Sequence, residues 1–380
     1  MTRMTLINAY LMSSSGSIIY LIAPVLIGSA MDSLAFDSEQ AGLLLAAYFL
    51  GYTLITTSAV FWLRHVNMRS AAWLSSFVFI AALLTGATQS AAALIYVGLF
   101  FAGVGAGMLY GISITIIGQS DAPDKHFGIA LAAQLVLGSA LLFAGPAIIG
   151  PQFGFAGILI ACAFYVAILS VTTQWTPTSI SRAEQSASNR LSSGSGTTVP
   201  VSLVALLCWF TGYSGVYAFV ERIGVAGGLS GQQIGLILSL TIISGVMGAM
   251  GAAWVGKRWG QMTPHWLGMA GTVVTIGLLS SEPGLVRYAL AIIALTLSLN
   301  FWLAYMLSSV TRVDISGRYA VLTTAALGGG AMVGPAISGL VLQQSNMLQV
   351  LLVSLVLIFI GFFGITIALR RFSAMPLNSH

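Results

Sequence analysis

Long, uninterrupted apolar segments dominate the chain, and they restrict its possible folds more than any other feature. Only 6% of the 380 residues are Asp, Glu, Lys or Arg, whereas a soluble globular domain carries about 25%. So few charges could not cover the surface of a soluble protein of this length. A disordered chain would need more charge and less hydrophobicity. These segments are therefore expected to lie in lipid.

Twelve of the segments are about as long as the roughly 20 residues that a helix needs to cross a bilayer. A membrane β-barrel is excluded because its strands alternate apolar and polar residues over about ten positions. The sequence thus predicts an all-α integral membrane protein with twelve transmembrane helices. The predicted spans are 6–30, 40–62, 69–88, 91–118, 127–150, 153–175, 200–223, 232–256, 264–281, 285–310, 318–343 and 347–370.

The basic residues predict how these helices are oriented. When successive loops are assigned to alternate sides, twelve of the 14 Lys and Arg residues fall on the side that holds both termini. Only Arg222 and Arg287 fall on the other side. Because positive residues accumulate in cytoplasmic loops, both termini are predicted to be cytoplasmic. The net charge of +5 is then a topological signal, with some contact to membrane lipid and no nucleic-acid partner.

A polar segment near the middle of the chain divides it in two. Residues 176–199 are rich in Ser, Gly and Thr, a composition typical of flexible linkers. They separate an N-terminal bundle, 1–175, from a C-terminal bundle, 200–380, and each contains six of the predicted spans. The linker is predicted to be cytoplasmic, since an even number of spans precedes it.

Short repeats relate the two halves. The sequence SEQAGLLL from Ser38 matches GQQIGLIL from Gly231, 193 residues later. The sequence AGPAIIG from Ala144 matches VGPAISG from Val333, 189 residues later. Two matches in the same order at similar offsets indicate a duplicated six-helix unit. The copies are expected to be related by an axis along the membrane normal, as pseudo-symmetric bundles.

Twelve spans, a duplicated half, a central linker and cytoplasmic termini together resemble the major facilitator superfamily over essentially the whole chain. The family's loop motif, Gly-x-x-x-Asp-Arg-x-Gly-Arg-Arg, is reduced here to SAVFWLRHVNMRS, which retains Arg64 and Arg69. The fourth span keeps the glycines of the family pattern in GVGAG, but Leu99 stands where the family has Arg. The resemblance implies a secondary transporter.

Two Gly-Pro pairs, Gly145-Pro146 and Gly334-Pro335, occupy matching positions in the halves. Proline bends a helix, and small residues let helices approach closely. These pairs are therefore predicted to be hinge or packing sites. The pattern Gly145-Pro146-x-x-x-Gly150 also resembles one that the family associates with proton-driven exporters, which favours antiport.

Glu221 is the one carboxylate placed well within a predicted span, and Arg222 follows it. Tyr217 and Tyr213 precede Glu221 by four and eight residues, which places them on one helix face. We predict that Glu221 has a coupling or gating role. It would carry a proton if its burial dominates, or brace a gate if Arg222 or Arg287 keeps it ionised. The alternative is that these charges lie at the membrane surface and contact outer water or lipid headgroups.

Polar and aromatic residues near the middle of the spans form the predicted substrate site. In the resembled family, spans 1, 4, 7 and 10 line the central cavity. An organic solute needs a few hydrogen-bonding groups among aromatic walls; hydrogen bonding between helices is the alternative role for such residues. The predicted substrate-binding residues are Tyr20, Tyr110, Gln134, Trp209, Tyr213, Tyr217, Asn300, Trp302 and Tyr305.

Cofactor and enzyme sites are not indicated. Glycine-rich runs such as GVGAG lack a following Lys-Ser/Thr and are predicted to pack helices rather than hold phosphates. The four histidines, His65, His126, His265 and His380, are expected in cytoplasmic loops or the tail, without metal-ligand spacing. No catalytic set of Ser or Cys with His can be assembled within the membrane.

The sequence therefore predicts a secondary active transporter of a small organic, partly apolar or aromatic solute. It is expected to work by alternating access, coupled to protons, as a monomer in a bacterial inner membrane. A sugar or a dianion is disfavoured, because the spans supply few amides and no basic residue near their middle. A proton-driven multidrug or metabolite exporter and an uncoupled facilitator stay open as alternatives.

Overall fold

The computed structural model describes residues 2–62, 66–121, 123–178, 198–256, 258–260, 262–281, 284–313 and 320–373, and the regular elements in these ranges are all helical. The α-helices of the N-terminal half are α1 (Arg3–Leu21), α2 (Ala23–Ser33), α3 (Ser38–Trp62), α4 (Met68–Thr88), α5 (Ala92–Gly118), α6 (Pro123–Ala144) and α7 (Gly150–Ser170). Those of the C-terminal half are α8 (Thr198–Ala226), α9 (Gly231–Val255), α10 (Met262–Leu279), α11 (Leu285–Val313), α12 (Ala320–Gln344) and α13 (Met347–Ser373). A π-helical turn, η1 (Gly145–Ile149), follows α6, and a 3₁₀ turn, η2 (Val171–Trp175), follows α7.

The helices have the length and surface of an integral membrane protein. Nine helical segments in the described part of the chain are long and apolar enough to cross a membrane, and the bent pair α1 and α2 adds a tenth. One of the nine, Lys125–Trp175, has 51 residues, or about 77 Å of helix, more than twice the roughly 30 Å hydrocarbon core. Gly154 breaks this segment with φ 60° and ψ −157°. Large apolar side chains such as Phe61 and Phe77 are exposed, as lipid-facing surfaces require.

The first predicted span consists of two helices joined at a bend. α1 and α2 meet at Ile22 with a bend of 46°. Pro24 is at the start of α2 and has no N–H to continue the α-helical hydrogen bonding. The bend is therefore encoded locally.

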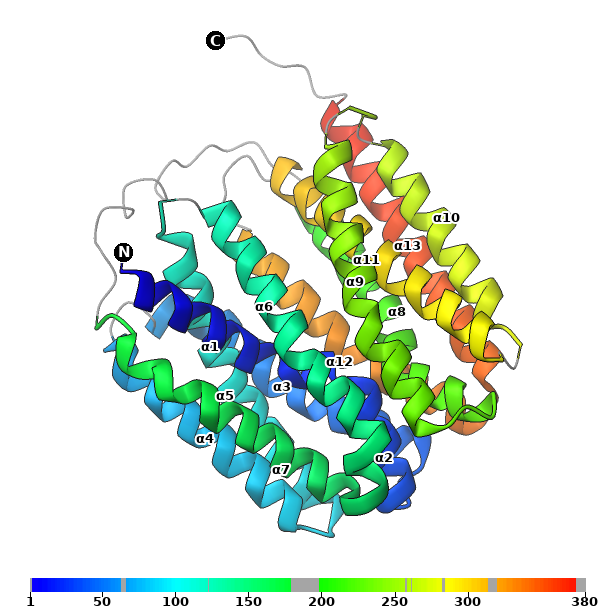
Figure 1. Ribbon diagram of the computed structural model, residues 1–380. Helices are drawn as coiled ribbons and strands as arrows, with labels where there is room; N and C mark the ends of the chain where they lie inside the picture. The colour runs from blue at the N-terminus through cyan, green and yellow to red at the C-terminus, as the bar shows by residue number, and fades with distance from the viewer. Residues whose placement is uncertain are drawn as a thin grey trace.

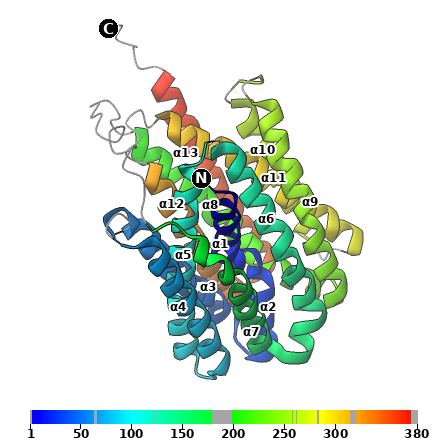
Figure 2. The same ribbon diagram turned by 60° about the vertical axis from the view of Figure 1, so that its left-hand side comes forward.

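In the described part of the chain, the main contacts between the two halves are those of α3 with α12, of α6 and η1 with α9, and of α2 with α8. Figure 1 shows α1 starting and α13 ending at the same end of the molecule, with α2, the end of α6 and the start of α9 at the other. The view in Figure 2 shows α4 and α9 on opposite sides of the molecule, with α1 and α8 between them.

Glycines create the close helix packing within each half. A Cβ on Gly103 of α5 would collide with the carbonyl oxygen of Tyr48 in α3. A Cβ on Gly248 of α9 would collide with that of Leu297 in α11. Both glycines belong to the glycine-rich runs of the sequence, so the expectation that these runs pack helices is confirmed.

Candidate functional site

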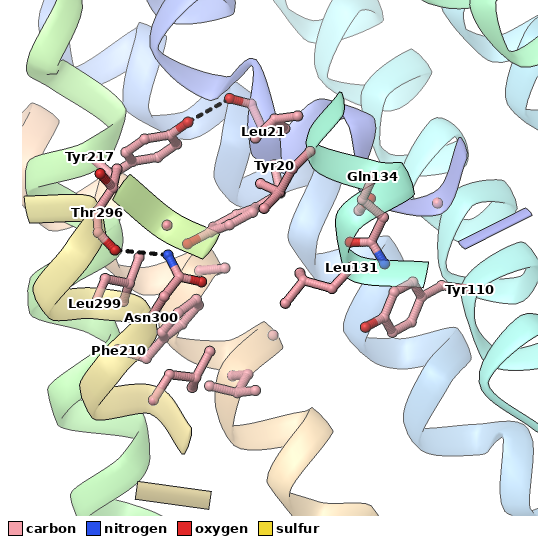
Figure 3. A pocket seen from close by; sticks show the side chains of 18 of the residues that line it. Tyr20, Leu21, Tyr110, Leu131, Gln134, Phe210, Tyr217, Thr296, Leu299 and Asn300 are labelled. Atoms are coloured by element: carbon pink, nitrogen blue, oxygen red, sulfur yellow. Dashed lines mark hydrogen bonds between the residues drawn. The ribbon is translucent and has the colours of Figure 1, made fainter. Parts of the chain in front are cut away.

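A cavity of about 300 Å³ lies between the two halves. Its walls come from α1, α3, α5 and α6 of the N-terminal half and from α8, α9, α11 and α12 of the C-terminal half. Figure 3 shows that its labelled side chains converge from both sides. Five predicted substrate-binding residues line it: Tyr20, Tyr110, Gln134, Tyr217 and Asn300.

Aromatic rings give this cavity its character. The ring of Tyr20 lies 5.8 to 6.0 Å from those of Phe49, Phe210 and Tyr217. Among the residues that the structure describes, those lining the cavity include no Asp, Glu, Lys or Arg. The site therefore suits an uncharged solute with apolar surface and disfavours an ion, whose desolvation no opposite charge would offset.

The break in the first span reaches the cavity wall. Tyr217 of α8 donates a hydrogen bond of 2.6 Å from its hydroxyl to the carbonyl oxygen of Leu21, the last residue of α1 (Figure 3). Both residues line the cavity. A side chain of one half thus contacts the backbone of the other half at the broken helix.

Three predicted substrate-binding residues lie elsewhere. Trp209, Tyr213 and Trp302 are fully buried and contact one another within the C-terminal half. Successive helical residues point about 100° apart, so Phe210 faces the cavity while Trp209 turns away from it. The Tyr213 hydroxyl bonds to Thr272 of α10. The sequence correctly indicated that α8 lines the cavity, but it did not distinguish the face with Phe210 from the face with Trp209.

Tyr305 and two histidines also depart from expectation. The Tyr305 hydroxyl donates to the carbonyl oxygens of Ala252 and Gly256 at the end of α9, and Tyr305 lines a separate cavity of about 480 Å³. His265 is not in a loop but buried in α10, where Trp302 donates to its Nδ1 at 2.8 Å. His126 lies in α6. His65 and His380 are outside the described residues.

An ionic cluster lies at one end of the interface between the halves. Arg222 holds both oxygens of Glu221, at 2.5 and 2.8 Å, and both oxygens of Asp32 on α2, at 2.6 and 2.8 Å. Glu221 is only 6% exposed, and a Cβ on Gly28 would collide with its carboxylate. The sequence identified Glu221 and Arg222 but missed Asp32, because only the bend before α2 brings it beside α8.

Arg287 does not take part in this cluster. Its guanidinium donates to the carbonyl oxygens of Leu278 and Gly277, both at 2.8 Å, at the end of α10. Carbonyl groups at a helix C-terminus lack intrahelical donors, so Arg287 caps this helix. The predicted pairing of Arg287 with Glu221 is therefore absent from this structure.

The Gly-Pro pairs mark equivalent contacts in the two halves. A Cβ on Gly145 would collide with Val25 of α2, and one on Gly334 with Ser214 and Thr211 of α8, so each glycine packs within its own half. The prolines face the opposite half. The Pro335 carbonyl oxygen contacts Gly42 of α3, and the Pro146 carbonyl oxygen contacts Gly231 of α9. Thus the two duplicated motifs of the sequence meet each other across the interface.

The sequence also matches a known family. The model of the Major Facilitator Superfamily aligns with residues 6–319, more than half of the chain. The chain belongs to the Major Facilitator Superfamily. No curated protein matches it at the sequence level.

Solved structures support the same assignment at the level of the fold. A crystal structure of the nucleoside transporter NupG is similar with a TM-score of 0.71 and 13% identity, covering 100% of both chains. The structure of a single-residue NupG mutant gives the same TM-score and identity and covers 98% of this chain and 100% of that one. Family and neighbours point to a transporter rather than an enzyme.

Membership in the Major Facilitator Superfamily bears on both the cavity and the ionic cluster. Transporters of this superfamily bind a small-molecule substrate, and the cavity between the halves is the candidate place for one in this chain. The described residues contain no group of three or more His, Cys, Asp or Glu side chains that could hold a metal ion. The candidate site is thus the charge-free cavity, with the ionic cluster of Asp32, Glu221 and Arg222 at one end of the interface.

Proposed function

We propose that this protein is a secondary active transporter that moves a small organic, partly apolar or aromatic solute by alternating access. The central observation is the uncharged aromatic cavity between two bundles that contact each other through α3 with α12, α6 with α9 and α2 with α8. Two bundles that rock about a fixed central site are the family's route to alternating access. A nucleoside, the solute named for the structural neighbours, fits this chemical description.

The contacts between the halves support an inward-facing assignment. The glycine contacts of Gly42 and Gly231 and the ion pair of Arg222 with Asp32 gather at the end opposite to the start of α1 and the end of α13 (Figure 1). If both termini are cytoplasmic, this closed end is the outer one. The proposal includes twelve crossings, bundles at 1–175 and 200–380 joined by the linker 176–199, and a monomer in a bacterial inner membrane.

Cysteine labelling tests this topology. Ser70, at the start of α4, and Ser345, at the end of α12, are both exposed. In a background without Cys162 and Cys208, we expect Ser70→Cys to react with a membrane-impermeant maleimide only from the cytoplasmic side and Ser345→Cys only from outside. Labelling of both from one side would contradict an odd number of crossings between them.

Proton coupling is part of the proposal, with an uncoupled facilitator as the second candidate. The charge-free cavity favours the facilitator, because no carboxylate among the described lining residues could exchange a proton there. The Gly145-Pro146 pattern favours a proton-driven exporter. Uptake driven by an imposed pH step, compared with counterflow in proteoliposomes without a gradient, separates the two, since only a coupled transporter concentrates solute from the pH step.

The alternating motion can be tested without a substrate. Thr324 of α12 lines the cavity. In an inward-facing protein, Thr324→Cys should react with a maleimide supplied from the cytoplasmic side and be protected from one supplied outside. Stabilising the outward-facing state should reverse the protection. If Thr324→Cys reacts equally from both sides, the cavity belongs to a channel and alternating access is wrong.

A further inference from the structure

Asn300 presents a hydrogen-bond acceptor of fixed orientation to the cavity. Its Nδ2 donates to the carbonyl oxygen of Thr296 at 2.8 Å. A carbonyl oxygen can only accept, so the amide nitrogen must face Thr296 and Oδ1 must point away from it. Figure 3 shows Oδ1 directed into the cavity, and no described residue donates to this atom. A solute that buries Oδ1 without donating to it would bind more weakly, because a buried acceptor without a donor costs free energy.

The opposite wall carries further unpaired polar atoms. Gln134 of α6 donates through Nε2 to the hydroxyl of Ser13 on α1, which leaves its carbonyl oxygen for the cavity. The hydroxyl of Tyr110 on α5 also lines the cavity and has no hydrogen-bond partner within the described chain. Amide and hydroxyl groups thus face a bound solute from both halves, and a solute with polar atoms at opposite edges would satisfy them.

Between these polar walls, the cavity offers flat aromatic surfaces. Phe210 stacks on Tyr20 with an interplanar angle of 25°, and Tyr217 lies at 30° to the same ring. Planar solutes gain stacking energy on such rings. A polyol would gain little here, and an anion or cation would find no opposite charge among the described lining residues.

We propose that the substrate is a neutral planar heteroaromatic of nucleobase type, free or as a nucleoside, that donates a ring N–H or amino hydrogen to Asn300 Oδ1. Carboxamide side chains pair with the donor and acceptor edges of bases, and aromatic side chains stack on their faces. The cavity supplies both from opposite halves, so the solute can bridge them. This inference rests on the proposed transport function and specifies its substrate.

Equilibrium binding to the purified full-length protein in detergent tests the proposal. The probes are radiolabelled uracil and adenine, with uridine and adenosine as competitors. We expect these bases to bind and 1,3-dimethyluracil, which has no N–H donor, to bind about 5- to 150-fold more weakly, the range that corresponds to an unsatisfied buried acceptor. Glucose and benzoate should not compete. Equal binding of uracil and its dimethyl analogue, no binding of any base, or competition by glucose or benzoate alone would overturn the proposal.

Variants of α11 test whether Asn300 is the residue that recognises the base. Asn300→Ala should weaken uracil binding about tenfold or more. It should not weaken 1,3-dimethyluracil binding, because the acceptor that this analogue leaves unsatisfied is gone, so the two ligands should bind more nearly alike. Tyr305→Phe, on the same helix but outside the cavity, should change neither. If Asn300→Ala does not fold, the comparison of uracil with 1,3-dimethyluracil on the wild-type protein still tests the proposal. Bases that bind but are not transported would refute the proposed function alone. Transport of another solute by a protein that binds no base would refute this substrate assignment alone.

Discussion

Gly42→Leu should abolish most transport while leaving a folded protein. A Cβ on Gly42 would collide with the backbone carbonyl of Pro335, and backbone atoms cannot move aside as side chains do. Overpacking such a contact costs about 1–3 kcal/mol, which shifts a two-state equilibrium about 5- to 150-fold. Because the collision exists only when the outer end is closed, the shift should favour the outward-facing state. Turnover in proteoliposomes and cytoplasmic labelling of Thr324→Cys should fall together.

Other glycines provide matched controls for this variant. Gly111→Leu introduces the same side chain on a helix where a Cβ has no heavy atom within 4 Å, so transport and labelling should stay near wild type. Gly145→Leu is expected to slow transport less than Gly42→Leu, because its Cβ would meet only a methyl group of Val25. If Gly42→Leu and Gly111→Leu transport equally well, the glycine contact is not part of the closed state.

The all-helical membrane fold could be predicted from local information, because continuous apolar runs specify helices in lipid. The duplicated six-helix bundle stays a prediction. The matching segments that begin at Ser38 and Gly231 also contain the glycines that contact the Gly-Pro motifs of the opposite half. The bend at Ile22 was readable in principle from Pro24, but a proline can also be absorbed within one helix, as Pro335 is in α12.

The site was predicted only in part, because its geometry depends on helix rotation and on contacts between halves. Polar residues near the middle of the spans pointed to Tyr20, Gln134 and Asn300. Phe210 was missed because an apolar residue in an apolar span gives no signal. Trp209 was misplaced, since a helix buried on nearly all sides has no amphipathic pattern that fixes its rotation.

Arg222→Met should have the largest effect of any change in the ionic cluster. It would leave the carboxylate of Glu221, only 6% exposed, without its partner whenever the outer end is closed. Removing one member of a buried ion pair costs about 3–5 kcal/mol, or roughly two to four orders of magnitude in population. The inward-facing state should therefore be depleted, with loss of transport and of cytoplasmic labelling at Thr324→Cys. Asp32→Asn should change transport and the labelling of Thr324→Cys by less than about fivefold. The Asp32 side chain is 66% exposed, and exposed ion pairs contribute only about 0–1 kcal/mol to the stability of a state.

The double variant Arg222→Met with Glu221→Gln separates a gate strut from a proton carrier. If Glu221 braces the closed end, removing both charges leaves no buried unpaired carboxylate, so the double variant should transport better than Arg222→Met alone. Glu221→Gln alone should then shift the labelling of Thr324→Cys and keep any pH dependence of transport. If Glu221 instead carries the coupled proton, Glu221→Gln should abolish pH-driven uptake but retain exchange. The geometry favours the strut, because Arg222 occupies both carboxylate oxygens and Glu221 does not line the cavity. A double variant no more active than Arg222→Met would refute the strut.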